Sequence, residues 1–378
     1  MIPTKKEMVL IKPSNFKTSS KELEIIGTIN PGAIRLPNND IVLYIRVIEK
    51  LIKDQDENYY YSPRMEGEET YKLILDKFDK KLVKYKNPLD IVFKDDTKRL
   101  TFISHFRRII LDKDGFKIKS IDKKPSFYGL SWDGELGVED PRIVKINNLY
   151  IMTYVALSRE ANISTCIAIS NDCKKWYRRG IIFEEQNKDV VIFPELFNKN
   201  YMAFNRPEGS FEFTQPHLWN SYSKNLEDWG RSKPFILSEK GWDSGRVGAG
   251  PPPIKTKEGW LLIYHGVKER SAIDNSIIGR IKRLLGIKNK RLVYNAGAVL
   301  LDLQNPSKIL AKTKNPIISP NKKYERGTFE KKDVFFPTGL VLDQNEKDIL
   351  LYSGGGDIVT TVRKININQI LNNLEIIT

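Results

Sequence analysis

Short apolar runs separated by polar turns recur along the chain, and five of them share one arrangement. Each begins at a small or proline-rich segment, continues as an apolar strand, reverses at a turn rich in Asn, Asp or Gly, and returns as a second strand that ends on a polar residue. We expect these hairpins over residues 32–46, 140–154, 193–206, 250–265 and 336–353. The pattern predicts an all-β protein.

A second repeated element follows two of the hairpins. Residues 170–176 and 223–229 each carry a Ser and a Trp six positions apart, as expected of an outer turn whose polar head bonds the backbone. Repeated four-stranded units are typical of a β-propeller, and five copies predict five blades. The alternative is a β-sandwich with chance internal similarity.

In a propeller the innermost strand of each blade lines a central channel. The residues that begin and end the hairpins are therefore expected to gather near the axis: Asp140, Glu195, Gly250, Arg46, Arg206 and His265. A funnel that holds carboxylates, arginines and a histidine suits a polar, partly anionic substrate.

Composition is that of an ordinary globular protein, with 378 residues, 40% of them hydrophobic and 29% charged. We expect a single domain over residues 1–378, with the charged stretch 49–96 at its rim. No apolar run is long enough to cross a bilayer, residues 1–17 do not resemble a signal peptide, and two cysteines are too few for a disulfide scaffold. These features predict a cytoplasmic protein with reduced thiols.

The segment 268–291 looks like an insertion. Its apolar residues fall on one face of a short helix, and arginines and lysines surround them. A basic amphipathic helix of this kind fits a lid over the site or a contact in a homo-oligomer better than it fits a membrane surface. We expect no stable membrane insertion.

The formal net charge of +15 raises nucleic-acid binding as an alternative. Against it, the basic residues are mostly lysines scattered through loops, and no nucleic-acid-binding module is recognisable. We therefore expect no nucleic-acid partner. The same positive field favours small anionic substrates such as phosphate.

The stretch Gly137–Arg142 carries the most informative chemistry, because it places Glu139 and Asp140 before a proline and an arginine. Pro141 fixes its own φ and has no N–H, so Asp140 is expected in a rigid turn at the start of a strand. Arg142 can keep one carboxylate ionised while the other transfers a proton. Such a pair suits general acid catalysis, although the motif alone fits a surface ion pair equally well.

With these residues assembled, the chain resembles glycoside hydrolase family 130, the mannoside phosphorylases and their β-mannosidase relatives. The resemblance rests on landmarks that occur in one order: 29–33, 137–142, 187–189, 193–195, 206–207, 248–253, 259–266, 298–308 and 352–357. It implies a five-bladed β-propeller with a central active site.

The resemblance implies that Asp140 is the general acid, acting through a hydroxyl of the bound mannose. It also implies that inorganic phosphate is the nucleophile and that α-mannose 1-phosphate leaves with inversion. An inverting hydrolase needs a second carboxylate to activate water, whereas phosphate needs cations to hold it. Phosphate is thus a co-substrate, and no cofactor is expected. No metal is expected either, because the three histidines lack ligand spacing.

The phosphate-holding positions of the family fall here on Asn187, Arg206, Arg246 and His265. Arg246 departs from the family pattern, which usually has lysine, but arginine keeps the charge and adds a bidentate fork. Asn205 stands where relatives often have histidine.

For the mannose ring we expect Arg46, Asp140 and Asp357, the last aimed by three preceding glycines. Trp242 or Tyr128 is considered as a stacking platform for the acceptor sugar.

The sequence thus predicts an inverting phosphorylase that cleaves a β-linked manno-oligosaccharide with phosphate. One alternative is a β-mannosidase on the same scaffold, which would lose the cationic cluster and gain a base. The other is a non-catalytic glycan-binding propeller.

Overall fold

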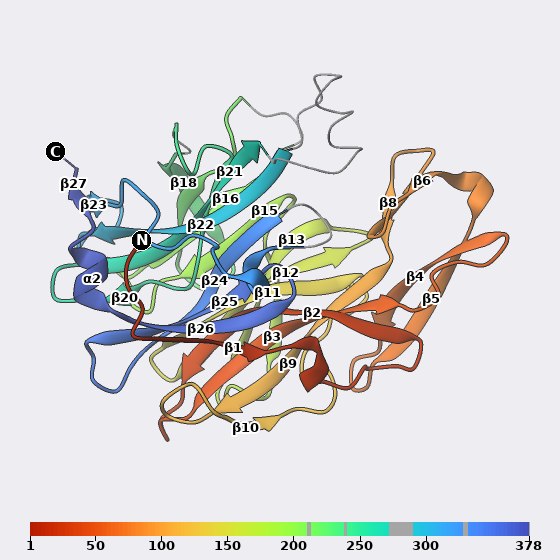
Figure 1. The fold of residues 1–378 in the computed structure, drawn as a ribbon, viewed down its shortest axis with the longest axis horizontal. Helices are drawn as coiled ribbons and strands as arrows, with labels where there is room; N and C mark the ends of the chain where they lie inside the picture. Colours follow the sequence, from red (N-terminus) through yellow and green to blue (C-terminus); the bar gives the residue numbers. More distant parts are fainter. Residues whose placement is uncertain (210–212, 238–239, 272–289, 328–331, 378) are drawn as a thin grey trace.

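The computed structural model describes residues 1–209, 213–237, 240–271, 290–327 and 332–377. Almost every regular element in them is a strand (Figure 1), which confirms the all-β prediction. The helical elements are α2 (Ile367–Leu371) and 3-10 turns at Pro13–Asn15, Lys80–Leu82 and Lys323–Glu325.

Three four-stranded antiparallel sheets follow one another along the chain. The first contains β2 (Leu23–Arg35), β3 (Ile41–Leu51), β9 (Phe102–Leu111) and β10 (Ile118–Ile121). The second contains β11 (Gly137–Ile146), β12 (Leu149–Ser158), β13 (Asn162–Ser170) and β14 (Tyr177–Phe183). The third contains β15 (Asn187–Ile192), β16 (Tyr201–Pro207), β17 (Leu218–Ser223) and β18 (Trp229–Ile236).

The remaining large sheet has two parts joined by a short parallel contact between β22 and β24. One part contains β19 (Arg246–Ala249), β20 (Ile254–Lys255), β21 (Trp260–Ser271), β22 (Lys290–Leu301), β23 (Ile309–Lys312) and β27 (Glu375–Ile376). The other contains β24 (Lys332–Leu342), β25 (Asp348–Gly355), β26 (Val359–Asn366) and β1 (Lys6–Ile11). Because β1 pairs with β26, the N-terminal strand completes a unit built by the C-terminal end of the chain.

The stretch expected at the rim leaves the first sheet between β3 and β9. It forms two small sheets, which Figure 1 shows together at one edge of the molecule. Their strands are β4 (Tyr59–Glu66), β5 (Lys72–Asp79), β6 (Val83–Lys86), β7 (Asp90–Phe93) and β8 (Lys98–Leu100).

Hydrophobic clusters lie between consecutive sheets and hold them together. Tyr44 and Met152 belong to the cluster between the first two sheets, and Phe204 and Trp260 belong to the one between the third sheet and β19–β22. Another cluster, which includes Tyr352, packs the C-terminal strands back against the first sheet. Burial of such side chains contributes about 1.5–3 kcal/mol each.

The third hairpin was misplaced in the sequence prediction. Its first strand is β15, Asn187–Ile192, and Pro194 follows it, where the missing N–H cannot continue the ladder. Glu195 therefore lies in an exposed turn, with its carboxylate 2.8 Å from Lys255 Nζ, and not near the centre. The prediction for Glu195 was wrong.

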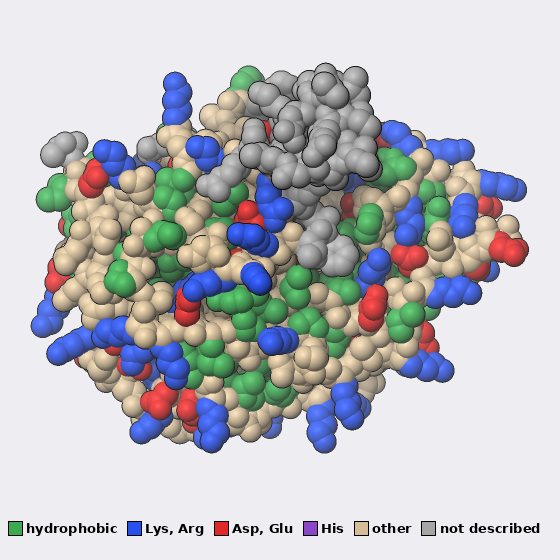
Figure 2. Space-filling model, viewed as in Figure 1, with side chains coloured by type: hydrophobic (Ala, Val, Ile, Leu, Met, Phe, Trp, Pro, Cys, Tyr) green, Lys and Arg blue, Asp and Glu red, His purple; other side chains and the backbone are tan. Residues whose placement is uncertain are grey.

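The described ends of the segment 268–291 belong to strands: residues 268–271 are the end of β21, and residues 290–291 are the start of β22. The helix expected inside this segment falls on residues 272–289, outside the described residues. Within the described part of the chain, no helix has the length and apolar character that a membrane span requires. Lysine and arginine side chains are spread over the face shown in Figure 2, with acidic side chains among them.

Candidate active site

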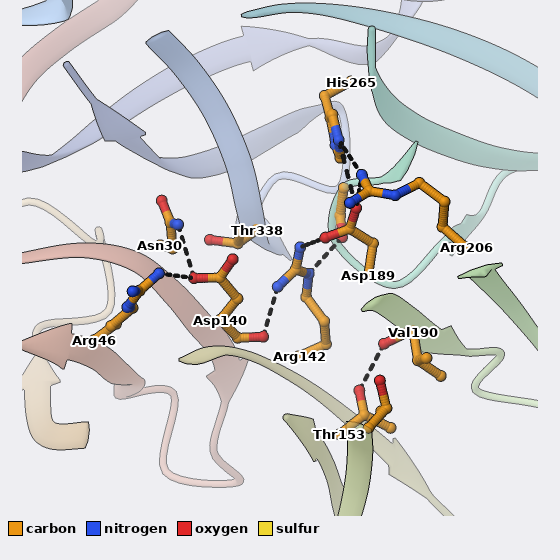
Figure 3. A network of polar contacts seen from close by, with 12 residues as sticks. Asn30, Arg46, Asp140, Arg142, Thr153, Asp189, Val190, Arg206, His265 and Thr338 are labelled. Atoms are coloured by element: carbon orange, nitrogen blue, oxygen red, sulfur yellow. Dashed lines mark hydrogen bonds and ion pairs between the residues drawn. The ribbon is translucent and has the colours of Figure 1, made fainter. Parts of the chain in front are cut away.

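A β-bulge recurs on β2, β11, β15 and β24, and each turns a polar residue out of its ladder. The bulged positions are Asn30, Asp140, Asp189 and Thr338. The first three have φ values of 48°, 51° and 54°, a left-handed conformation that Asn and Asp tolerate better than most residues. Figure 3 shows these four side chains gathered in one place, although they come from four different strands.

A cavity of about 440 Å³ opens beside them. Its polar lining residues are Glu24, Asn30, Arg46, Lys50, Glu139, Asp140, Lys188, Asp189, Arg206, Arg246, His265, Tyr294, Lys332 and Asp357. Six of the seven residues to which we assigned catalysis, phosphate binding or mannose binding are among them.

Asp140 is held through one of its two carboxylate oxygens. Its Oδ1 accepts hydrogen bonds from Asn30 Nδ2 at 2.8 Å and from Arg46 Nη1 at 3.2 Å (Figure 3). In the described part of the chain, Oδ2 receives no hydrogen bond. Arg142 Nη1 donates to the Asp140 backbone carbonyl at 2.6 Å. The backbone and one oxygen are thus fixed, and the second oxygen remains available to a substrate hydroxyl.

Arg46 joins the two acids of the Glu139–Asp140 pair. It contacts the Glu139 carboxylate through Nη2 and Asp140 through Nη1. Burial opposes its charge, but the two carboxylates outweigh burial and raise the pKa of Arg46. Arg46 is therefore a permanent cation beside the acid.

Asp189 is the hub of a second cluster in the same cavity. Its Oδ1 lies 3.3 Å from Arg142 Nη2, and its Oδ2 contacts Arg206 Nη1 and lies 3.5 Å from His265 Nε2. Only 4% of Asp189 is exposed. Removing one member of such a buried pair costs about 3–5 kcal/mol, because it leaves an uncompensated charge.

His265 is fully buried and accepts a hydrogen bond from Arg206. Arg206 Nη1 lies 3.1 Å from His265 Nε2, and a guanidinium can only donate, so Nε2 must accept and Nδ1 carries the hydrogen. Burial and the charges of Arg206, Arg142 and Arg246 lower the pKa of His265 well below 6.5. The cationic cluster expected from the sequence therefore contains a neutral histidine. Its Nδ1 has no hydrogen-bond partner in the described residues.

Gly248 on β19 lets this cluster form. It is the strand neighbour of His265, and a Cβ at this position would overlap the Asp189 carboxylate, the His265 ring and the Arg206 guanidinium. Gly248, in the glycine-rich run that follows Arg246, is thus explained by close packing of side chains against the backbone.

Arg246 and Arg206 share one further carboxylate. Glu208 contacts Arg206 Nη2, and its Oε1 lies 3.7 Å from Arg246 Nη1. Arg246 is the more exposed of the two arginines, with 37% of its side chain accessible against 5% for Arg206. Arg246 therefore faces solvent at the end of the cavity where Arg206 is buried.

Asp357 is exposed and lines the cavity. Desolvation by the cavity walls, together with the charges of Asp140 and Glu139, raises its pKa, against the opposing effect of Lys332 and Arg46. Its φ is 58°. Among the preceding glycines, Gly354 allows close approach to Asn30, because a Cβ at Gly354 would overlap Asn30 Oδ1.

Asn187 does not line the cavity among the described residues. Its Oδ1 accepts a hydrogen bond from the Arg206 backbone N–H, and its Nδ2 donates to Asn205 Oδ1, both at 3.1 Å. It therefore supports Arg206 from behind. Trp242 and Tyr128 are also absent from the described lining; Trp242 packs over glycines of β21 and β22.

The sequence interpretation assigned no role to Asn30, Asp189, Lys188 or Lys332. Asp189 was within a recognised landmark, 187–189. Asn30 precedes Pro31 in the same way that Asp140 precedes Pro141, so the Asn/Asp-Pro pair was an available signal. In the described residues, no group of three or more His, Cys, Asp or Glu side chains has the arrangement of a metal site.

Comparison with known proteins places this chain in a family. A family model described as beta-1,4-mannooligosaccharide phosphorylase matches residues 91–376. A 1,2-beta-oligomannan phosphorylase of Thermoanaerobacter sp. (strain X514) is 35% identical over 263 residues, which cover 69% of this chain and 78% of the relative.

A beta-1,2-mannobiose phosphorylase of Listeria innocua is 30% identical over 382 residues, which cover 98% of this chain and 97% of the relative. A solved structure of the beta-1,2-mannobiose phosphorylase from Listeria innocua, in complex with beta-1,2-mannobiose, matches with a TM-score of 0.79 over 96% of each chain. The match to the family model, which spans more than half of the chain, agrees with these relatives, and the chain belongs to glycoside hydrolase family 130.

Proposed function

We propose that the protein is an inverting phosphorylase that cleaves a β-linked manno-oligosaccharide with inorganic phosphate. One observation carries this proposal: a carboxylic acid held at one oxygen, Asp140, and a cluster of arginines around a neutral histidine open onto the same cavity. The relatives named as mannoside phosphorylases support it.

Phosphate binds at the Arg206 end of the cavity. Arg206 and Arg246 supply charge, and the unpartnered Nδ1–H of His265 donates a hydrogen bond to a phosphate oxygen. A neutral histidine is useful here because it adds a donor without a further charge to bury. Asn187, which we expected to bind phosphate, supports phosphate binding only indirectly, by accepting a hydrogen bond from the Arg206 backbone N–H.

The mannose ring binds between Arg46, Asp140 and Asp357, all of which line the cavity. A phosphate oxygen attacks the anomeric carbon as the bond to the leaving sugar breaks. The proton for the leaving oxygen comes from Asp140, relayed by a mannose hydroxyl. Carbon–oxygen bond formation on the opposite face gives α-mannose 1-phosphate and a shortened chain.

The acceptor sugars bind along the wall of the cavity that the first sheet and the rim provide. Ile26, Ile48, Pro88, Leu89 and Phe102 form an apolar surface there. Apolar side chains of this kind pack against the C–H faces of a sugar and exclude water. The rim sheet β6–β8 therefore takes part in substrate binding and contributes to the choice of acceptor sugar.

An inverting β-mannosidase would require a free carboxylate to activate water on the face of the sugar opposite the acid. Two of the other acids in the cavity are already engaged: Glu139 contacts Arg46, and both oxygens of Asp189 contact arginines. The retained cations Arg206 and Arg246 favour phosphate as the nucleophile.

The strands support a five-bladed propeller that forms one domain over residues 1–378. Three separate four-stranded sheets supply three blades, and the large sheet divides at the parallel β22–β24 contact into two further units. Strand β1 closes the last unit, and a hydrophobic cluster packs that unit against the first sheet. Closure of this kind protects sheet edges.

The test is run in the synthetic direction. The protein is incubated with α-mannose 1-phosphate and mannose, glucose, N-acetylglucosamine or mannobiose, and phosphate release is followed. Acceptor-dependent release that falls by about 10²–10⁴-fold in Asp140→Asn supports the proposal. Cleavage of β-mannosides without phosphate would make the protein a hydrolase, and silence in both assays would favour a glycan-binding protein.

A further inference from the structure

A second cavity of about 720 Å³ lies outside the active site and shares no lining residue with it. It is bordered by the turn before β16, by β17 and β18, and by the loop between β22 and β23. We name it the β17–β18 groove, and its lining residues are Phe197, Asn198, Asn200, Met202, Asn220, Tyr222, Arg231, Ser232, Lys233, Gln304, Asn305, Pro306 and Ser307.

Asn220 lines this groove, and its buried side-chain amide makes a hydrogen bond through the nitrogen but not through the oxygen. Its Nδ2 donates to Ser307 Oγ at 3.0 Å, and only 4% of the residue is exposed. Its Oδ1 is buried and has no hydrogen-bond partner in the described residues. A buried polar atom without a partner is unfavourable, so a ligand that donates a hydrogen bond here would be stabilised.

Tyr222 and Arg231 form an ordered wall beside Asn220. The Tyr222 hydroxyl lies 2.5 Å from Ser307 Oγ, and the Arg231 guanidinium carbon lies 4.9 Å from the centre of the Tyr222 ring. Arg231 Nη2 also donates to Asn200 Oδ1 at 2.9 Å. Arg231 has a φ of 52°, a conformation that costs energy in a residue other than glycine and that clusters at ligand sites.

The chemistry of the lining selects a neutral ligand rich in hydroxyls. Among the described lining residues there are amides, hydroxyls and two cations, and no carboxylate. An ionised carboxylate or a fully deprotonated phosphate monoester could accept from Arg231 and Lys233, but neither has a hydrogen to give to Asn220. A sugar hydroxyl both donates and accepts, so it can meet the amides and the arginine fork together.

We propose that the β17–β18 groove is a second binding site for a neutral oligosaccharide, separate from the catalytic cavity. The choice of a manno-oligosaccharide as its ligand rests on the proposed function. Binding at two places on one enzyme raises the effective concentration of a long substrate. The groove should therefore matter for long chains and not for a disaccharide.

Calorimetric titration with mannohexaose in phosphate-free buffer tests the groove without turnover. Arg231→Ala and Asn305→Ala alter exposed lining residues, and Lys224→Ala, which removes an exposed positive charge outside the lining, is the matched control for Arg231. We expect two binding events in the wild type, and at least tenfold weakening of one of them in both groove variants. Lys224→Ala should keep both events, and thermal unfolding should show that every variant is folded.

Kinetics then separate the groove from the catalytic site. In the groove variants the KM for mannohexaose should rise severalfold, while kcat and KM for mannobiose stay at wild-type values. A single binding event that the groove variants leave unchanged would overturn the proposal, as would equal weakening in Lys224→Ala or binding of inorganic phosphate in place of the sugar. If Asp140-dependent activity is absent but Arg231-dependent binding persists, only the proposed function fails; the reverse result overturns only the groove.

Discussion

Asn30 donates a hydrogen bond from Nδ2 to Oδ1 of Asp140 over 2.8 Å, and so ties β2 to the acid on β11. Both residues stand at β-bulges with positive φ. The contact leaves Asp140 Oδ2 for the substrate, because the only other side chain that binds the carboxylate, Arg46, also uses Oδ1 among the described residues. Asn30 therefore acts on the reaction by positioning the acid.

Replacing Asn30 by glycine tests this role. Glycine accepts the φ of 48° without strain, so the substitution removes the amide and keeps the backbone. We expect kcat to fall by about 10²-fold because the acid is no longer held in place, while the KM for phosphate stays constant. Steady-state kinetics in both substrates measure this.

Asn147→Gly is the matched control, since Asn147 has a φ of 53° in the exposed turn between β11 and β12 of the second sheet. Its kinetics should equal those of the wild type. An Asn30→Gly enzyme with normal kcat would remove Asn30 from the positioning of Asp140.

Gly248→Ala should damage phosphate binding selectively. The added Cβ would overlap Asp189, His265 and Arg206, so the arginine and the histidine must move apart. We expect the KM for phosphate to rise by more than about tenfold, which corresponds to about 1.4 kcal/mol. The measurement is phosphorolysis of a β-mannoside at varied phosphate concentration.

Gly230→Ala is the control for this substitution, because a Cβ at Gly230 meets no atom within 4 Å. It should leave the phosphate dependence unchanged. If Gly248→Ala has a normal KM for phosphate, then the Asp189–Arg206–His265 cluster does not bind phosphate.

The local elements could be predicted from the sequence, and the contacts between distant strands could not. Alternation of apolar and polar residues located the β2–β3, β11–β12 and β24–β25 hairpins, because side-chain period and turn residues are local properties. The third hairpin was shifted because Phe193-Pro194-Glu195 resembles a strand start, whereas Pro194 in fact ends the preceding strand.

The same limit applies to the site. Arg206 and His265 were expected together because both end a repeat, and the structure places them 3.1 Å apart. Asp189 was missed as the partner of Arg206 and the neighbour of His265, because a bulge, which shifts the register by one residue, turns it inward. The neutral state of His265 depends on burial among three arginines, and no sequence pattern reports burial of that kind.

The pH dependence of stability should reveal the neutral state of His265. Its folded pKa lies below the unfolded value of about 6.5, so the unfolded chain binds more protons as the pH falls through this range. The contribution of neutral His265 to the free energy of unfolding is therefore fully present above about pH 6.5 and is lost progressively below that pH. Chemical denaturation from pH 8 to pH 5 should show this loss in the wild type.

In His265→Gln the loss over this range should be smaller, because no proton is taken up at that position on unfolding. His217→Gln removes a histidine outside the cavity lining and serves as the control. Equal slopes for the wild type and His265→Gln would show that His265 binds the same number of protons in the folded and unfolded states, and that folding does not lower its pKa.

Leu89→Ala should weaken the binding of acceptor sugars without affecting phosphate. Leu89 is half-buried in the rim and belongs to the apolar wall of the cavity, so its truncation removes apolar contact at about 25 cal/mol per Å². We expect the KM for the acceptor to rise by about three- to tenfold in the synthetic reaction.

Leu82→Ala, on the same rim but 58% exposed and outside the described lining, should change nothing. If the two variants behave alike, or if the KM for phosphate changes with Leu89→Ala, the acceptor does not bind along this wall, and the rim sheet would have to be excluded from substrate selection.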